Sequence, residues 1–242
     1  MTPFEFWYAG ALVLEHPLHQ HVQRVLRRAA RAYSHTPRLL DVGGRRSNYT
    51  IAVPAEVWLS DIPREKEIQR ELDLGATDKI REKVLKRRSN VHSYVYDDMT
   101  VTSFPAAHFD IVTAIEVLEH VEEDEDFLRN VATVLRPGGM FLMTTPNGDF
   151  RPTPYPDHKR HYRASGLEAM LARHFANVRI EYRVNSGRLF QLGLHKPSLQ
   201  TPFRTASSLF GFCISALLER AGLGGPGPVG KLHLMAVCKK AA

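Results

Sequence analysis

The stretch Leu39-Leu40-Asp41-Val42-Gly43-Gly44 decides the fold, because an apolar run there ends in an acid followed closely by two glycines. A second apolar run, Val57-Trp58-Leu59-Ser60-Asp61, ends in an aspartate twenty positions after Asp41. A glycine turn lets the backbone approach a ligand closely, and an acid at the tip of the next strand accepts hydrogen bonds from both ribose hydroxyls. The spacing therefore indicates a nucleotide-type pocket.

Beyond this stretch, patterns typical of buried strands alternate with patterns typical of amphipathic helices. The alternation predicts an α/β fold with a parallel sheet and right-handed crossovers. Ligands of such sheets bind at the carboxyl ends of the strands. The predicted strands cover residues 38–42, 57–60, 91–96, 109–115, 140–144, 178–182 and 232–237, and the main predicted helices cover 22–33, 127–135 and 167–175. The residues expected at carboxyl ends are Asp41, Asp61, Asp98, Glu116 and Thr145.

Four segments are expected. Residues 1–36 form a helical preface or lid, 37–183 the core, 184–230 an insertion that can cover an acceptor, and 231–242 the final strand of the core. The highly charged segment 64–88 reads as one or two solvated helices interrupted near Gly75.

Composition is that of a globular protein, with 242 residues, 43% hydrophobic residues and a formal net charge of +6. The two cysteines, Cys213 and Cys238, form no disulfide framework, which favours a reducing compartment and a cytoplasmic location. The apolar run 6–14 lacks the basic start and small-residue cleavage site of a signal peptide. The run 209–218 is too short to cross a bilayer, which takes about 20 residues.

The order of these pieces resembles the class I S-adenosylmethionine (SAM)-dependent methyltransferases over residues 38–183. The matching motifs are Leu39-Leu40-Asp41-Val42-Gly43-Gly44, Asp61, Asp97-Asp98-Met99, Phe109-Asp110-Ile111-Val112, Glu116-Val117-Leu118-Glu119-His120-Val121 and Leu135-Arg136-Pro137-Gly138-Gly139. They look like the small-molecule branch, which contains the ubiquinone-type O-methyltransferases, and residues 147–162 resemble enzymes of glycan and natural-product pathways. The resemblance implies a Rossmann-like seven-stranded sheet, six strands parallel and the last antiparallel beside 178–182.

The resemblance also implies which residues contact the cofactor, SAM. Asp61 would hold the ribose, Asp98 the adenine amino group, and Glu116 would follow the strand that approaches the SAM amine. Strand-end aspartates are also common turn formers and helix caps, Asp97 is an alternative to Asp98, and Asp110 is expected to be structural. The residues assigned to SAM are Asp41, Gly43, Gly44, Asp61, Asp98, Met99 and Glu116.

The glycine loop departs from the Gly-x-Gly-x-Gly pattern of the family, because Arg45 and Ser47 replace its second and third glycines. A side chain at position 45 would crowd the ligand if the loop kept its usual path. We expect either a differently bent loop or a role for Arg45 or Arg46 in pairing with the SAM carboxylate or a substrate anion. The alternative is a pair of exposed arginines.

Methyl transfer from a sulfonium depends mainly on positioning, and a base is needed only for a weakly acidic hydroxyl. His120, His158 and His161 are the catalytic candidates, the alternative being packing or surface histidines. Glu116, Glu119 and His120 would share a helix face and could hold a divalent ion. The acids that follow fit the positive N-terminus of a helix, so no metal is assigned.

The expected reaction is methylation of a small-molecule acceptor, most simply a hydroxyl of a sugar, glycan or natural product. The run 203–218 is expected as a core or lid helix, with a dimer face or peripheral membrane contact as alternatives; the oligomeric state is open. Competing functions are a non-catalytic SAM-fold binding protein, an RNA-associated methyltransferase and an NAD-dependent dehydrogenase. No Asn/Asp-Pro-Pro-Tyr/Phe motif follows the fourth strand, which argues against a nucleic-acid base as acceptor.

Overall fold

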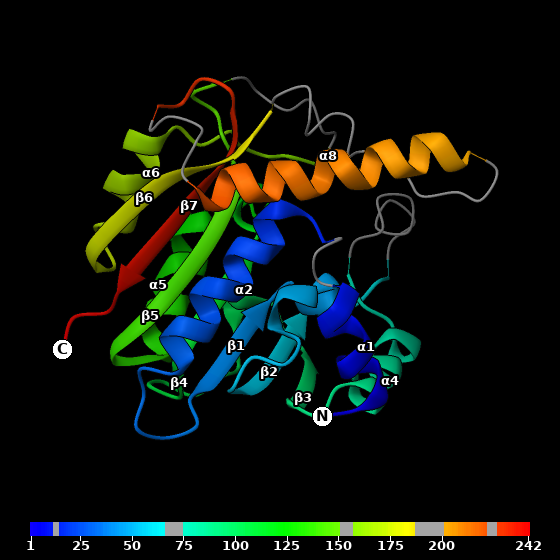
Figure 1. The fold of residues 1–242 in the computed structure, drawn as a ribbon. Coiled ribbons are helices and arrows are strands. Elements are labelled where there is room, and N and C mark those ends of the chain that lie inside the picture. Colours follow the sequence, from blue (N-terminus) through cyan, green and yellow to red (C-terminus); the bar gives the residue numbers. More distant parts are fainter. Residues whose placement is uncertain (12–14, 66–74, 151–156, 187–200, 222–226) are drawn as a thin grey trace.

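The computed structural model describes residues 1–11, 15–65, 75–150, 157–186, 201–221 and 227–242. Seven strands form one sheet in the order β3-β2-β1-β4-β5-β7-β6 (Figure 1). The strands are β1 (Arg38–Val42), β2 (Glu56–Asp61), β3 (Val91–Tyr96), β4 (Phe109–Ile115), β5 (Leu135–Pro146), β6 (Ala176–Asn185) and β7 (Lys231–Lys239).

Strand direction follows the prediction. Each pairing from β3 through β5 is parallel, whereas β7 is antiparallel to both β5 and β6. β6 therefore runs in the direction of β1 to β5, and the last strand is inserted between β5 and β6. This confirms the predicted sheet of six parallel strands and one antiparallel strand.

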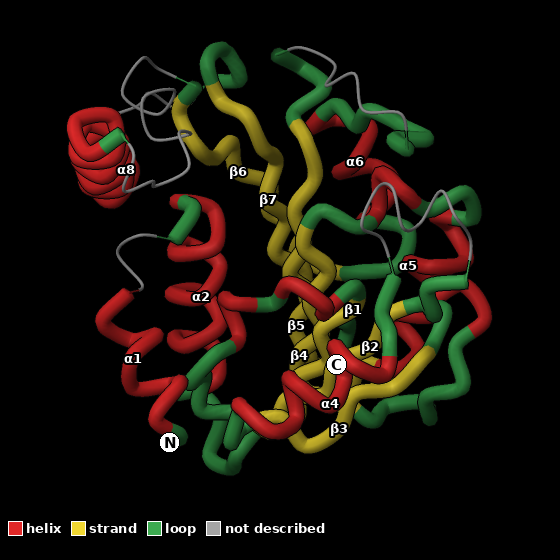
Figure 2. Tube along the Cα trace, turned by 90° about the vertical axis from the view of Figure 1, so that its right-hand side faces the viewer, coloured by secondary structure: helices red, strands yellow, loops and turns green. Residues whose placement is uncertain are grey.

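Helices cover both faces of the sheet. α1 (Pro3–Ala11), α2 (Pro17–Ala30) and α8 (Pro202–Arg220) lie on one side, and α5 (Asp124–Val134) and α6 (Ala164–Leu171) on the other (Figure 2). α4 (Asp78–Arg87) contacts β3. None of the helices in these described ranges is long and apolar enough to span a membrane.

Two buried apolar clusters, one on each face, follow from alternation along the strands. Leu40 and Val112 belong to the cluster under α5 and α6, whereas Leu39 and Ile111 belong to the cluster under α2. Successive side chains of a strand point to opposite faces, so each central strand contributes to both clusters. Packing on both faces thereby fixes the positions of the strand ends, where the predicted site residues lie.

Several predicted boundaries were wrong. The helix expected over 22–33 begins at Pro17, because the His16 side chain accepts from the Leu18 N–H and proline suits the first helical turn. The strand expected at 140 already begins at Leu135, since α5 ends at Val134. Between β1 and β2 lie two short 3₁₀ helices, η2 (Gly44–Arg46) and η3 (Asn48–Thr50).

Parts of several predicted segments lie outside the described residues, including 12–14 of the predicted preface and 151–156 of the segment 147–162. Residues 66–74 of the charged segment are among them, and its described remainder includes α4. Residues 187–200 and 222–226 of the predicted insertion also lie outside, and α8 is the helix that the structure places in the insertion.

Candidate functional site

The predicted acids meet at the carboxyl edge of the sheet. In the parallel register Val42 lies opposite Ser60 of β2 and opposite Ala114 of β4. The ends of β1, β2 and β4, which carry Asp41, Asp61 and Glu116, are therefore side by side. In open α/β sheets, ligands bind in the crevice at this carboxyl edge.

Gly43 and Gly44 form a tight turn after β1. Gly43 has φ +72°, and a Cβ there would lie 2.7 Å from Cγ2 of Val117, in the segment after β4. A Cβ on Gly44 would lie 3.0 Å from Cδ2 of Leu59 and 3.4 Å from Oδ2 of Asp41. A side chain at Gly43 would be strained and would clash with Val117, whereas one at Gly44 would require Leu59 to shift by a few tenths of an ångström.

Ser47, where the family has a glycine, is bound by a buried arginine. The Nη1 of Arg88 donates to the Ser47 carbonyl oxygen at 3.2 Å and to its Oγ at 3.0 Å, and Nη2 donates to Thr50 Oγ1 at 2.6 Å. Arg88 is 6% exposed, and burial lowers its pKa to about 10. A side-chain anchor thus holds the loop at this position, and whether its path differs from that of the family stays a prediction.

Asp41 lies beneath this loop and is fully buried. The Tyr49 hydroxyl donates to its Oδ1 at 3.0 Å. Burial raises the pKa of Asp41 to about 7, and the hydrogen bonds from Tyr49 and Ser47 offset this only in part. Asp41 therefore supports the loop from below.

Asp61 ends β2 and is 8% exposed. Burial raises its pKa to about 6, while the charge and backbone N–H of Arg45 act in the opposite direction. The loop arginine is thus placed beside the proposed ribose acid. The Arg46 side chain lies outside the described atoms, and pairing of either arginine with a ligand anion stays a prediction.

The two aspartates after β3 differ in their contacts. Both Asp97 oxygens accept hydrogen bonds from Thr102 and Ser103. Asp98 is exposed, and its Oδ1 accepts from Thr100 at the start of η4 (Met99–Val101). Asp97 therefore closes the loop, and Asp98 is the better placed of the two to meet a ligand. The structural role expected of Asp110 is confirmed by its bonds to the Arg38 N–H and Arg136.

Glu116 does not begin a helix as the metal hypothesis assumed. Its φ is +55°, and the turn that follows is the 3₁₀ helix η5 (Leu118–His120). Its Oε2 is bonded to Nδ1 of His233 at 3.1 Å. Burial alone would raise the pKa of Glu116, but the charge and hydrogen bond of His233 hold it below its usual range.

His233 is a candidate that the sequence analysis missed. It lies at the start of β7, opposite Pro146 at the end of β5. Because β7 is antiparallel, its beginning lies at the edge where the other strands end. His16 packs against His233 with ring centroids 5.9 Å apart, and burial, helped by the His233 charge, lowers the pKa of His16 to about 3. The last strand is predicted from the sequence to be antiparallel. That direction places the beginning of the strand at this edge and could have indicated His233.

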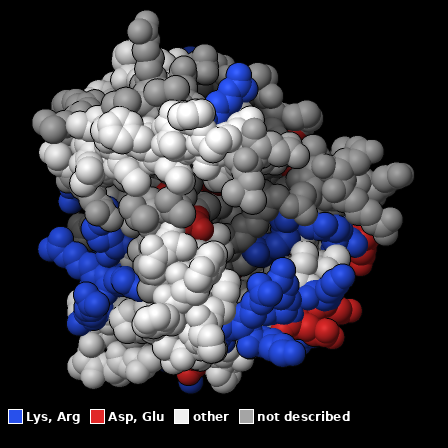
Figure 3. Space-filling model, turned by 45° about the vertical axis from the view of Figure 1, so that its right-hand side comes forward, with Lys and Arg blue, Asp and Glu red and all other residues white. Residues whose placement is uncertain are grey.

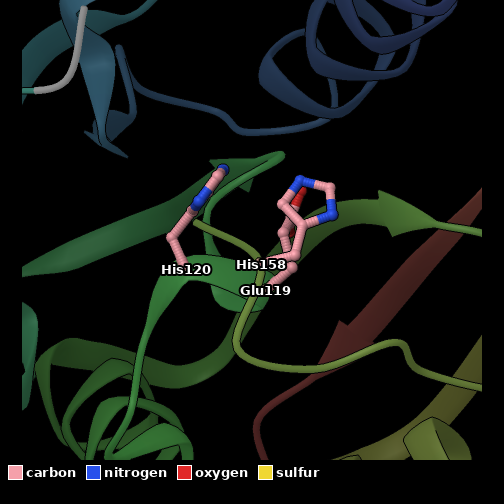
Figure 4. A group of neighbouring side chains, drawn as sticks. All are labelled: Glu119, His120 and His158. Carbon is pink, nitrogen blue, oxygen red and sulfur yellow. The ribbon is translucent and has the colours of Figure 1, made fainter. Parts of the chain in front are cut away.

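A second cluster joins Glu119, His120 and His158, whose ligand-type atoms lie within 4.8 Å of one another. The three side chains point toward the same side, with the Glu119 carboxylate against the His158 ring (Figure 4). Asp157 Oδ2 is 2.9 Å from His120 Nδ1. His161 is exposed, and its ring centroid lies 5.7 Å from that of His158.

Glu119 is the least satisfied group in this cluster. It is 1% exposed, and among the described residues neither of its carboxylate oxygens forms a hydrogen bond, although nearby Thr145 acts to lower its pKa. Burial and the neighbouring Glu116 charge raise the pKa of Glu119 well above its usual range. A buried carboxylate beside two imidazoles is a donor set that fits a divalent cation. The trio differs from the predicted one, because His158 takes the place of Glu116.

A pair of glycine variants tests the loop geometry. Gly43→Ala adds a Cβ at φ +72° and against Val117, whereas Gly138→Ala adds one at φ +71° with nothing within 4 Å. We expect Gly43→Ala to lower the free energy of unfolding by about 1–3 kcal/mol more than Gly138→Ala, since only the first overpacks. Urea unfolding of both variants measures this. Equal losses, or no recovery when Val117→Ala is added, would contradict the steric explanation.

Comparison with known proteins agrees with this fold and edge. A family model described as a methyltransferase domain matches residues 14–192. The ubiquinone biosynthesis O-methyltransferase of Coxiella burnetii is 34% identical over 59 residues, which cover 24% of this chain and 25% of that protein. The 27-O-demethylrifamycin SV methyltransferase of Amycolatopsis mediterranei is 31% identical over 135 residues, covering 54% of this chain and 42% of that protein. The chain thus spans less than half the length of either relative.

Solved structures show the same fold at low identity. Phosphoethanolamine N-methyltransferase 2 of Haemonchus contortus, in complex with SAM, has a TM-score of 0.58 at 16% identity and covers 91% of this chain and 52% of that one. A SAM-dependent methyltransferase of Archaeoglobus fulgidus has a TM-score of 0.55 at 19% identity, covering 92% and 94%. The sheet order of this chain and the acids at its carboxyl edge are those of the class I SAM-dependent methyltransferases. The chain belongs to the methyltransferase domain family.

Proposed function

We propose that this protein transfers the methyl group of SAM to a hydroxyl of a small-molecule acceptor, such as a sugar, a glycan or a natural product. Two of its curated relatives are named for O-methylation in ubiquinone biosynthesis and for methylation of a rifamycin. The observation that carries the proposal is the acid-paired histidine beside the cofactor edge, His120 with Asp157.

Cofactor binding is assigned to the strand ends. Asp61 would accept from the ribose, Asp98 from the adenine amino group, and the Gly43 turn would let the methionine part approach the backbone. These residues support the assignment because they share one edge and lie in the order that the family motifs require. When bound, SAM supplies an activated methyl group, and its transfer to a hydroxyl releases S-adenosylhomocysteine and one proton.

His120 is proposed to take that proton. The Asp157 carboxylate at Nδ1 favours the tautomer that carries hydrogen there and presents Nε2 as the proton acceptor. Asp157 also stabilises the imidazolium that forms. His158 packs against the His120 ring with centroids 5.0 Å apart and would orient it, and His161 would border the acceptor.

The test is a methyl-transfer assay with purified protein, labelled SAM and a panel of hydroxylated acceptors. His120→Gln should lower kcat about 100-fold, the lower range for a general base, while SAM affinity measured by calorimetry stays within about twofold. His174→Gln is the matched control, because His174 is also 2.9 Å from an acid, Glu125, but lies after α6, away from this edge. Unchanged kcat in His120→Gln would refute the base, and a folded protein that binds no SAM would support a non-catalytic role.

A metal-assisted form of the same reaction is the second candidate. The observation favouring it is the buried Glu119 carboxylate, which forms no hydrogen bond among the described residues and lies next to His120 and His158. A cation there would stabilise the ionised carboxylate, and Asp157 would orient His120 as a ligand. The cation would lower the pKa of an acceptor hydroxyl as a Lewis acid. In this form no base function is required of His120.

Titration with Mg²⁺, Mn²⁺ and Zn²⁺ separates the two forms. Because the pKa of Glu119 is raised, cation binding should release a proton, seen as a calorimetric enthalpy that depends on the buffer. Glu119→Gln should abolish cation binding and the effect of EDTA on activity. If His120 acts as a base instead, Glu119→Gln and EDTA should leave kcat nearly unchanged.

A further inference from the structure

The outer side of α8 carries a stripe of exposed apolar side chains. Phe203 is 90% exposed, Phe210 61% and Leu217 59%. They are spaced seven residues apart, which is close to two full turns, so they point to nearly the same side over about 21 Å. Among the α8 side chains that the structure describes, Arg204 is the only charged one.

The neighbouring helix, α2, presents a basic stripe. Arg24 and Arg28 of α2 and Arg31 at its C-cap are exposed at spacings of four and three residues, and α2 contains no Asp or Glu. Its other side, with Leu18, Val22 and the residues around them, is buried on the sheet. α2 contacts α8, and both lie on the same side of the molecule (Figure 2).

Together the two helices make a surface of mixed character. In the upper part of Figure 3 the atoms that are not grey are mostly white, with one Lys or Arg side chain among them, and the other Lys and Arg side chains gather below. Exposed aromatic and aliphatic side chains next to arginines are the pattern of segments that lie in the headgroup layer of a bilayer. Anionic lipids attract such basic residues, and the formal net charge of +6 acts in the same direction.

We propose that α8 and α2 dock on an anionic lipid surface, with Phe203, Phe210 and Leu217 inserted among the headgroups and the α2 arginines on lipid phosphates. A second copy of the chain fits less well, because a two-fold dimer on this face brings arginine stripes together without acids to pair them. The contact would place α8 and α2 at the membrane, next to the end of α2 that carries His16. An apolar acceptor dissolved in the bilayer would then reach the site without crossing water.

Co-sedimentation of the full chain with vesicles tests this surface. We expect binding to phosphatidylcholine vesicles containing about one third phosphatidylglycerol, and little binding to phosphatidylcholine alone. The variant Phe203→Ser/Phe210→Ser/Leu217→Ser should lose binding at least fivefold, and Arg24→Gln/Arg28→Gln/Arg31→Gln should do likewise. Val229→Ser is the apolar control, since Val229 is 79% exposed elsewhere, and Lys79→Gln/Lys83→Gln/Lys86→Gln on α4 is the charge control.

Three results would overturn the proposal. They are absence of wild-type binding to anionic vesicles, equal losses in the controls, and a wild-type dimer that becomes monomeric when the α8 stripe is removed. Circular dichroism and SAM affinity of each variant establish that the protein is folded. Because lipid binding is read without any acceptor, its failure is distinguishable from failure of the proposed methyl transfer.

Discussion

Replacing Arg88 by methionine should lower the free energy of unfolding by about 3–5 kcal/mol. The substitution removes the charged donor of the Ser47 carbonyl, Ser47 Oγ and Thr50 Oγ1, which keep only the bonds between Ser47 and Thr50, and it removes the charge that faces buried Asp41. Breaking one partner of a buried charged network costs this much because the remaining groups cannot reach water. For a chain of this size the loss corresponds to a fall in Tm of about 6–20 °C, measurable by calorimetry.

The control is Arg129→Met, which removes an arginine whose side chain is 60% exposed and paired with Asp126 on the surface. Exposed pairs contribute at most about 1 kcal/mol, so this variant should unfold close to the wild-type temperature. Arg88→Lys should recover part of the loss by supplying one charged donor. A similar Tm for Arg88→Met and Arg129→Met would show that the loop does not depend on the anchor.

Asp61→Asn should weaken SAM binding about 10- to 100-fold. A charge-assisted hydrogen bond is worth about 1.5–3 kcal/mol, and an amide cannot accept from two hydroxyls with the same strength. Burial raises the pKa of Asp61 to about 6, so lowering the pH through 6 protonates the carboxylate. The affinity of the wild type for SAM should therefore fall as the pH drops below about 6, as measured by calorimetry between pH 5 and 8.

The variant itself provides the comparison, because Asp61→Asn lacks the titrating group. Its affinity should depend less on pH than that of the wild type, and any remaining dependence would come from other acids such as Asp41, whose pKa is about 7. Asp126→Asn is the surface control. Parallel pH profiles for the wild type and Asp61→Asn would mean that Asp61 does not contact the ligand.

The framework of the site could be predicted because its residues follow strand ends. Asp41, Asp61 and Asp98 lie close to their strands in sequence, so recognising the strands was enough to bring the acids together. The position of a strand end depends mainly on the local sequence pattern of that strand. The seven-stranded sheet followed in the same way, once the inserted last strand was expected from the family resemblance.

The partners of these residues could not be predicted, since they come from distant segments. Arg88 is 41 residues from Ser47 and His233 is 117 from Glu116, and no short-range pattern marks either contact. Arg88 looked like one more charge in a solvated segment. The positive φ of Glu116 likewise depends on tertiary contacts, which is why the expected helical face of Glu116, Glu119 and His120 did not form.

The inserted position of β7 has a consequence for biosynthesis. β6 is made some 45 residues before β7, yet its place in the sheet is beside β7. A nascent chain that has emerged only as far as β6 carries a strand whose neighbour does not yet exist, with the flank of β5 open as well. Insertion of β7 closes both gaps and brings His233 to Glu116 in one event. Completion of the sheet and completion of the histidine-rich side of the site thus depend on the same strand, which is made after the other six.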